Sequence, residues 1–322
     1  MQSKSRLSNP NTFEPSVVAQ SNTRSNHNGW LFAIFATLCF SIAPPIARYA
    51  IRSGIDSTTL VTLRLGLATL LMGITVAVIN PSQLKMKRQG LLVSWSAGIV
   101  NGIGMLLFFW ALERVDASMA SMMITLVPLV VLSLLALRGE RFTYRQIVRM
   151  ALGLGGVYLL IGLGGHVNTT GVLLLTVAVF CFATHITLLQ WYLSGYEALT
   201  VTFHISAAMS VAVGCWWLLR GVAWRPLGMQ GWIALLTLVI FSTYLSRISF
   251  VSAVAHLGSG QVSLMSPLET FLTVIWSMLF LDERLSPLQW VGGIFVMASA
   301  LLAIKRLGRA TWRPRWRLWS KV

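Results

Sequence analysis

Residues 170–193 read TGVLLLTVAVFCFATHITLLQWYL and contain no Asp, Glu, Lys or Arg. A helix needs about 20 apolar residues to cross a hydrocarbon layer roughly 30 Å thick. Barrel strands, the other structure that satisfies its backbone polar groups in lipid, alternate polar and apolar residues over about ten positions. This long and uniformly apolar stretch therefore predicts a membrane-spanning helix.

Nine further stretches have a similar length and are predominantly apolar. They lie at roughly 29–48, 57–79, 90–112, 117–137, 143–163, 197–219, 231–255, 260–281 and 286–304. In the whole chain 56% of residues are hydrophobic and 11% are charged, whereas about a quarter are charged in a soluble domain. We therefore expect an all-α integral membrane protein with ten transmembrane helices.

The stretch at 170–193 also resembles the first apolar stretch, at 29–48, and the likeness extends along the chain when the sequence is shifted by about 142 residues. The matching positions are Gly29 with Gly171, Cys39-Phe40 with Cys181-Phe182, Phe108 with Phe250, and Ala111 with Ala253. We expect a first five-helix repeat at 29–165 and a second at 166–304. Because five spans is an odd number, the second repeat enters the membrane from the opposite side, and the repeats are inverted.

Inverted repeats are a common construction of secondary transporters. A pseudo-two-fold axis in the membrane plane makes the inward-open and outward-open packings nearly equivalent. The duplication therefore predicts transport by alternating access, although it does not indicate the substrate.

The net charge of +16 raises the question of a nucleic-acid ligand. However, only Arg64 and Arg247 lie well inside a span, and the other Lys and Arg residues lie at helix ends, in loops and in the tails. Most of them fall on the side of the N-terminus, which predicts that both termini are cytoplasmic. We expect a disordered tail at 1–28 and a basic tail at 305–322 that is anchored at lipid headgroups, with no nucleic-acid partner.

Short motifs recur in both repeats. The first repeat carries Ala111-Leu112-Glu113-Arg114-Val115, Pro128 and Gly139-Glu140-Arg141, and the second carries Ala253 to Leu257, Ser266-Pro267-Leu268-Glu269 and Asp282-Glu283-Arg284-Leu285-Ser286. In their order and spacing, these motifs resemble the EamA-type members of the drug/metabolite transporter superfamily, over essentially the whole chain after residue 28. The resemblance implies a basket of helices around a central cavity, lined mainly by the first, third, fourth, sixth, eighth and ninth spans.

Two positions depart from that family pattern. Thr270 stands where a Glu-Pro pair is usual, and we expect this change to alter helix geometry only. His204 takes the place in the second repeat that Arg64 holds in the first. A structural role is favoured for Arg64, which begins its span and can snorkel outward or bond nearby carbonyls.

Glu269 is the only carboxylate expected inside a span. A charge inside the bilayer is costly and is therefore a candidate for function, so proton coupling through a carboxylate would use Glu269. Arg247 is expected at a similar depth and close enough to pair with it. The pair has two interpretations, a substrate or coupling site and a static bridge between two helices.

Four more residues are expected to contact the substrate: His185, Asn101, Tyr244 and Phe40. A packing role is the alternative for His185 and for Asn101, which lies in a motif of small residues at 98–102 that lets helices approach closely. No Cys-x2-Cys or His-x3-His pair accompanies His185. We therefore expect no metal and no other cofactor.

Pro44 and Pro45 lie near the outer end of the first span. Two adjacent prolines remove two backbone donors, so they should kink or break the helix. Their counterparts in the second repeat, Ile186 and Thr187, do not. We expect a gate at this point, and simple termination of the helix is the alternative.

The sequence as a whole predicts a secondary transporter in a bacterial inner membrane that exports amino acids or similar small metabolites as a monomer or homodimer, with proton coupling through Glu269. The alternatives are an intramembrane enzyme and a receptor or scaffold that does not transport. The sequence contains no GxSxG or HExxH motif and no pair of intramembrane acids, so we do not expect an enzyme.

Overall fold

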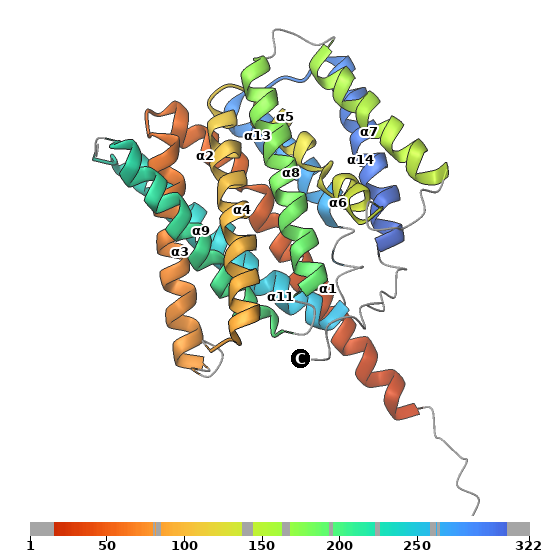
Figure 1. Ribbon diagram of the computed structural model, residues 1–322. Coiled ribbons are helices and arrows are strands. Elements are labelled where there is room, and N and C mark those ends of the chain that lie inside the picture. Colours follow the sequence, from red (N-terminus) through yellow and green to blue (C-terminus); the bar gives the residue numbers. More distant parts are fainter. Residues whose placement is uncertain are drawn as a thin grey trace, which may run out of the picture.

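The computed structural model describes residues 16–79, 81, 85–136, 144–162, 168–192, 196–222, 226–257, 262 and 265–307. The described elements of more than one turn are all helices, and they form an elongated bundle (Figure 1). Their bounds are α1 Ser16–Ser41, α2 Ala43–Arg52, α3 Ser57–Ile79, α4 Arg88–Leu112, α5 Ala117–Ile124, α6 Val127–Ala136, α7 Tyr144–Gly162, α8 Thr169–Tyr192, α9 Ala198–Arg220, α10 Met229–Thr237, η2 Leu238–Leu245, α11 Ser246–Leu257, α13 Ser266–Leu281 and α14 Pro287–Leu307.

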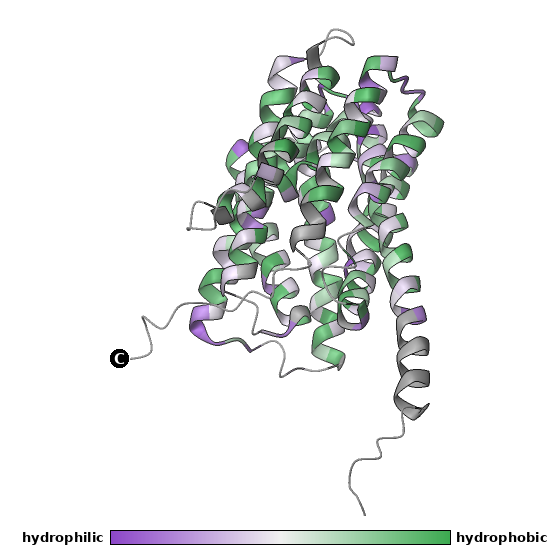
Figure 2. Cartoon of the chain, turned by 90° about the vertical axis from the view of Figure 1, so that its right-hand side faces the viewer, coloured by the Kyte–Doolittle hydropathy of each residue, from purple (hydrophilic) through white to green (hydrophobic). Residues whose placement is uncertain are grey.

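Hydrophobic residues run along most of the length of the helices (Figure 2). Leu70, Leu154, Leu173 and Leu219 are each more than half exposed, as expected where the surrounding medium is lipid. Among the described residues, six helical stretches are long and apolar enough to cross a bilayer: His27–Arg52, Ser57–Val78, Arg88–Leu112, Thr169–Leu189, Leu199–Arg220 and Met229–Val254. Shorter apolar helices cover Ala117–Val131, Met150–Leu160, Ser266–Leu281 and Pro287–Ser299, so a count of ten spans remains a prediction.

The first span is broken where the two prolines predict it. α1 ends at Ser41 and α2 starts at Ala43, with Pro44 and Pro45 in its first turn. The first helix also starts before the predicted first span. α1 begins at Ser16, so residues 16–28 are helical, because a helix that is already nucleated gains one hydrogen bond for each residue that it adds. Residues 1–15 and 308–322, which hold most of the expected tails, lie outside the described residues.

The fourth span is also discontinuous. α5 ends at Ile124 and α6 begins at Val127, directly before Pro128, which cannot donate a helical hydrogen bond. Its counterpart α13 begins at Ser266, with Pro267 in its first turn. Helix breaks inside a membrane protein occur where the freed backbone groups are buried or line a cavity.

The eighth span contains a feature that the sequence did not predict. Between α10 and α11 the chain winds as the π-helix η2, Leu238–Leu245, whose wider turns are frequent at functional sites. Its counterpart α4 is regular over Arg88–Leu112, so the two repeats differ here.

The main contacts between helices are repeated when the helices of one half are exchanged for their counterparts in the other half. α4 packs on α8 as α11 packs on α1, and α4 packs on α9 as η2 packs on α3. α7 and α14, the last helices of the two halves, pack on each other at the edge of the bundle (Figure 1). Between α4 and α9 the small residue Gly98 faces Ala208 and the carbonyl of Ile205, so the predicted close approach of helices at 98–102 is confirmed.

Candidate functional site

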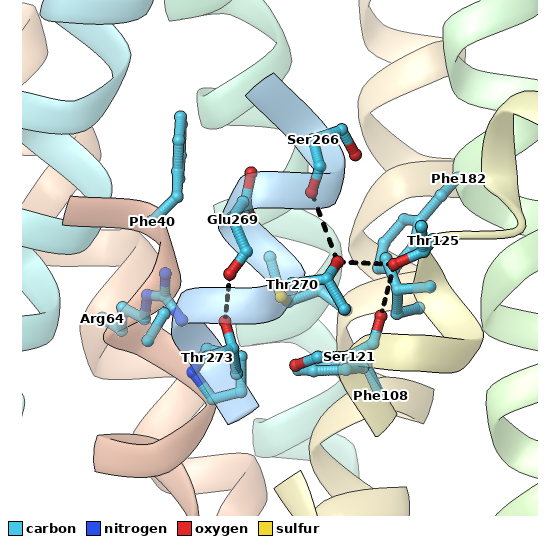
Figure 3. A pocket seen from close by; sticks show the side chains of 14 residues that line it. Phe40, Arg64, Phe108, Ser121, Thr125, Phe182, Ser266, Glu269, Thr270 and Thr273 are labelled. Carbon is cyan, nitrogen blue, oxygen red and sulfur yellow. Dashed lines mark hydrogen bonds between the residues drawn. The ribbon is translucent and has the colours of Figure 1, made fainter. Parts of the chain in front are cut away.

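A cavity of about 170 Å³ lies between the two halves, beside the breaks in the first and fourth spans (Figure 3). The first half contributes Phe40, Ala43, Pro44, Arg64, Met105, Phe108, Ser121, Ile124 and Thr125. The second half contributes Phe182, Ser266, Glu269, Thr270 and Thr273. The lining therefore combines aromatic and aliphatic side chains with hydroxyl groups and two charged side chains.

Glu269 is the only acidic residue among those that line this cavity. It lies in the first turn of α13 and is half-buried. Its backbone carbonyl accepts a hydrogen bond from Thr273 Oγ1, but within the described residues its carboxylate has neither a hydrogen bond nor an ion pair. A half-buried carboxylate that faces a cavity without a partner is poised to accept a proton or to bind a cation.

Arg64 is the cation of the same cavity. Its Nε donates to Thr243 Oγ1 at 2.8 Å and its Nη2 donates to Ser242 Oγ at 2.9 Å. The guanidinium carbon lies 5.7 Å from the centre of the Phe109 ring. Since both hydroxyls come from η2, the π-helix fixes the guanidinium. The sequence favoured a structural role for Arg64, but the structure places it in the cavity wall, where it is nearly fully buried and forms no ion pair with any described residue.

Hydroxyl groups join the two halves beside these charges. Thr125 Oγ1 and Thr270 Oγ1 lie 2.5 Å apart. Ser121 also lines the cavity, and its buried Oγ has no hydrogen-bond partner among the described residues. Thr270 therefore does more than alter helix geometry, which is all that the sequence predicted for it, because its side chain forms part of the wall.

The expected pair of Arg247 with Glu269 is wrong. Both residues are described, and no ion pair joins them. Arg247 Nη1 instead donates to Ser206 Oγ on α9 at 2.9 Å, and Arg247 is not among the residues that line the cavity. The pair was predicted from depth along the two spans, which does not fix the helix face that a side chain occupies, and the π-helix directly before Arg247 changes that face.

Three other predicted substrate contacts lie between helices, outside the cavity wall. His185 Nδ1 is 3.1 Å from the carbonyl oxygen of Ala97, an acceptor to which the ring can only donate. Tyr244 Oη lies 2.6 Å from Thr75 Oγ1, and Asn101 Nδ2 donates to Met209 Sδ at 3.2 Å. Of the residues predicted for binding and gating, Phe40, Glu269 and Pro44 line the cavity, while Pro45 lies buried beside them in α2.

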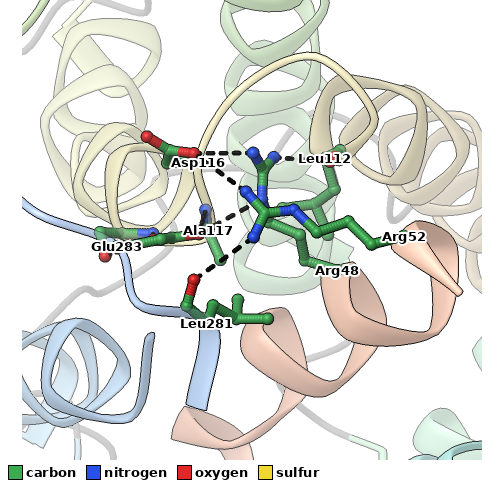
Figure 4. Close-up of polar contacts among 8 residues, drawn as sticks. Arg48, Arg52, Leu112, Asp116, Ala117, Leu281 and Glu283 are labelled. Carbon is green, nitrogen blue, oxygen red and sulfur yellow. Dashed lines mark hydrogen bonds and ion pairs between the residues drawn. The ribbon is translucent and has the colours of Figure 1, made fainter. Parts of the chain in front are cut away.

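A cluster of charged groups joins α2 to the start of α5 and to the end of α13 (Figure 4). Arg48 Nη1 donates to the Leu112 carbonyl at 2.8 Å, and Nη2 donates to Asp116 Oδ1 at 2.7 Å. Arg48 Nε lies 3.2 Å from Glu283 Oε1, within ion-pair distance but without the alignment of a hydrogen bond.

The carboxylate of Glu283 also binds the start of α5. It accepts hydrogen bonds from the Ala117 and Ser118 backbone amides at 2.9 and 3.0 Å and from Ser118 Oγ at 2.7 Å. Asp282, which precedes it, ends α13 in the left-handed conformation, with a φ of 53°, and so turns the chain toward α5. From the sequence, Arg48 and Glu283 are expected at helix ends or in loops, and the repeated Glu-Arg motif is the one signal that marks Glu283.

Comparison with known proteins identifies relatives of the chain. Residues 27–162 and 169–305 each match the sequence profile of the EamA-like transporter family. A solved structure described only as "Crystal structure of protein" is similar in fold, with a TM-score of 0.58 and 18% sequence identity over 89% of this chain and 99% of that one. None of the curated proteins matches the sequence.

Proposed function

The chain belongs to the EamA-like transporter family, and we propose that it is a secondary transporter that exports amino acids or similar small zwitterionic metabolites by alternating access. The observation that carries this proposal is the pair of unmatched charges, Arg64 and Glu269, in one cavity. Nothing in the described structure favours an enzyme or a scaffold over a transporter.

The two charged groups of an amino acid are complementary to the two charged side chains of this cavity. Its ammonium supplies the cation that the Glu269 carboxylate lacks, and its carboxylate supplies the anion that Arg64 lacks. Arginine binds carboxylates well because its nitrogens form a planar fork. The side chain of the substrate would lie against Phe40, Phe108 and Phe182. A polyanion fits poorly, since only one cation lines the cavity.

The two halves support alternating access. Their contacts exchange about a two-fold axis, as expected if two nearly equivalent packings open the cavity to opposite sides. With ten spans and the excess of Lys and Arg beside the N-terminus, both termini would lie in the cytoplasm of a bacterial cell, and the charged cluster around Arg48 would lie at the outer end. The break at Pro44 and Pro45 would act as the hinge of an outer gate.

Glu269 gives the transporter a route for proton coupling. The ionised carboxylate binds the substrate ammonium from the cytoplasm. On the outer side a proton adds to the carboxylate as the substrate leaves, and the proton is released inside when the cavity faces the cytoplasm again. Each cycle then exchanges one proton for one substrate, because both occupy the same group.

Flux in proteoliposomes tests the function directly. Labelled amino acids, the corresponding amines and the corresponding carboxylic acids would be assayed with and without a pH gradient. We expect amino acids to be moved faster than either partial analogue and to be driven by the gradient. Absence of flux for every solute, in a preparation in which a known carrier of the family works, would contradict the proposal and favour a receptor or scaffold.

A further inference from the structure

We propose that Arg48, Asp116 and Glu283 form a latch that holds the cavity closed at its outer end and opens once in each transport cycle. This proposal rests on the proposed alternating access. It concerns how the cavity is closed and is independent of which substrate occupies it.

The latch lies directly beyond the cavity. Three helices each carry a residue that lines the cavity. Three or four residues further toward the same end of the bundle, each also carries a residue that takes part in the latch. These pairs are Pro44 and Arg48 on α2, Phe108 and Leu112 on α4, and Ser121 and Ser118 on α5. At 1.5 Å per residue, the latch contacts lie about 5 to 6 Å along each helix from the cavity wall. Glu283 follows α13, whose first turns line the cavity.

The segment that carries Arg48 is attached at its other end to the second half. Pro45 has no N–H, so the carbonyl of Ser41 lacks its helical partner. That carbonyl lies 2.9 Å from Thr273 Oγ1 and shares its proton with the Glu269 carbonyl, and Ser41 Oγ accepts a hydrogen bond from Trp276 Nε1 at 3.1 Å. α2 is therefore held by α13 at its hinge and lies beside Glu283 at its far end, so α2 and α13 form one side of the gate.

The other side of the gate is the corner between α4 and α5. Arg48 reaches this corner through the Leu112 carbonyl and Asp116, and Glu283 reaches it through the amides of Ala117 and Ser118. If the corner separates from α2 and α13, Arg48 and Glu283 remain each other's partner. No buried charge is then left unpaired, which is the condition for such a contact to open at low cost.

Arg52 provides a matched control on the same helix. It lies one turn after Arg48 and also approaches Asp116, at 3.7 Å, and the Leu281 carbonyl, at 3.4 Å. However, its side chain is 48% exposed, whereas that of Arg48 is 9% exposed. Exposed ion pairs contribute little to stability, so the loss of Arg52 should not open the gate.

The test measures access to the cavity from the latch side. Cys39, Cys181 and Cys215 would be replaced by Ser, and Ser121→Cys would place one thiol in the cavity wall. A membrane-impermeant maleimide would then be added on the latch side of oriented proteoliposomes. We expect Asp116→Asn and Arg48→Gln to raise the labelling rate about tenfold or more, as expected for the loss of a charge-assisted hydrogen bond, and Arg52→Gln to change it less than twofold.

Three results would contradict the latch. The first is an unchanged rate of thiol labelling in both latch variants, and the second is an equal rise of this rate in Arg52→Gln. The third is faster labelling from both sides of the membrane, which would indicate a general loosening of the protein. Asp116 is 49% exposed, so Asp116→Asn remains a usable variant if Arg48→Gln does not fold. The assay requires no substrate. Unchanged labelling together with normal flux would therefore reject the latch alone, whereas changed labelling without any flux would reject the proposed transport alone.

Discussion

Arg64 and Glu269 line the same cavity from opposite halves of the protein, and neither forms an ion pair with the other or with any other described residue. Arg64 is fixed by two hydroxyls of η2, whereas the carboxylate of Glu269 has no such support. The cation is therefore held in position, and the anion is free to change partner, as a site that alternates between substrate and proton requires.

Replacing Arg64 should remove recognition of the substrate carboxylate only. In Arg64→Gln we expect the preference for an amino acid over the corresponding amine to fall about 10- to 100-fold, the range for losing a hydrogen bond to a charged group. Competition between the two compounds for uptake into proteoliposomes measures this preference. Arg247→Gln is the matched control, because Arg247 bonds Ser206 outside the cavity wall. An equal loss in both variants would contradict the assignment of Arg64.

The hydroxyl pair of Thr125 and Thr270 should couple the two halves. We expect Thr125→Val and Thr270→Val each to lower the free energy of unfolding by about 0.6 kcal/mol, the average for a hydrogen bond between membrane helices, and the double variant to lose less than the sum. SDS-induced unfolding in mixed micelles measures these values. Thr187→Val serves as the control, since Thr187 bonds only the Ala183 carbonyl of its own helix. Strictly additive losses would show that the two hydroxyls do not interact.

The contact between α4 and α9 depends on Gly98. A Cβ at this position would lie 2.6 Å from the Ala208 Cβ and 2.7 Å from the Ile205 carbonyl oxygen, and a backbone atom cannot move aside easily. Gly98→Ala should therefore destabilise the protein by about 1–3 kcal/mol. Gly66 on α3 has open space around its Cβ position, so Gly66→Ala should instead stabilise by about 0.5–1 kcal/mol. The same unfolding assay compares them, and equal stability of the two variants would contradict the packing.

Much of the fold could be predicted from apolar length, duplication and proline positions. The break near Pro44, the close approach at Gly98 and the family were all predicted correctly, because each depends on a local pattern. The ionic contacts were predicted poorly. Arg247 was paired with Glu269 from depth alone, and the π-helix η2, which has no clear sequence pattern, changes what the following turn faces. Arg64 was given a structural role because it begins its span, and the hydroxyls that hold it are distant in the sequence.

The latch was missed for a different reason. Charges near the end of a span, such as Arg48, are usually interpreted as topology signals, and their partners are distant in the sequence. Arg48 and Glu283 come from opposite halves of the chain and meet only after the two repeats pack together.

Proton-driven export through Glu269 is tested most directly by amino-acid flux from proteoliposomes under an imposed pH gradient. We expect the gradient to accelerate flux in the native protein and in Glu113→Gln, whose carboxylate lies at the end of α4 outside this cavity, and to have no effect on Glu269→Gln. Flux in Glu269→Gln that responds to the gradient as the native protein does would contradict the account.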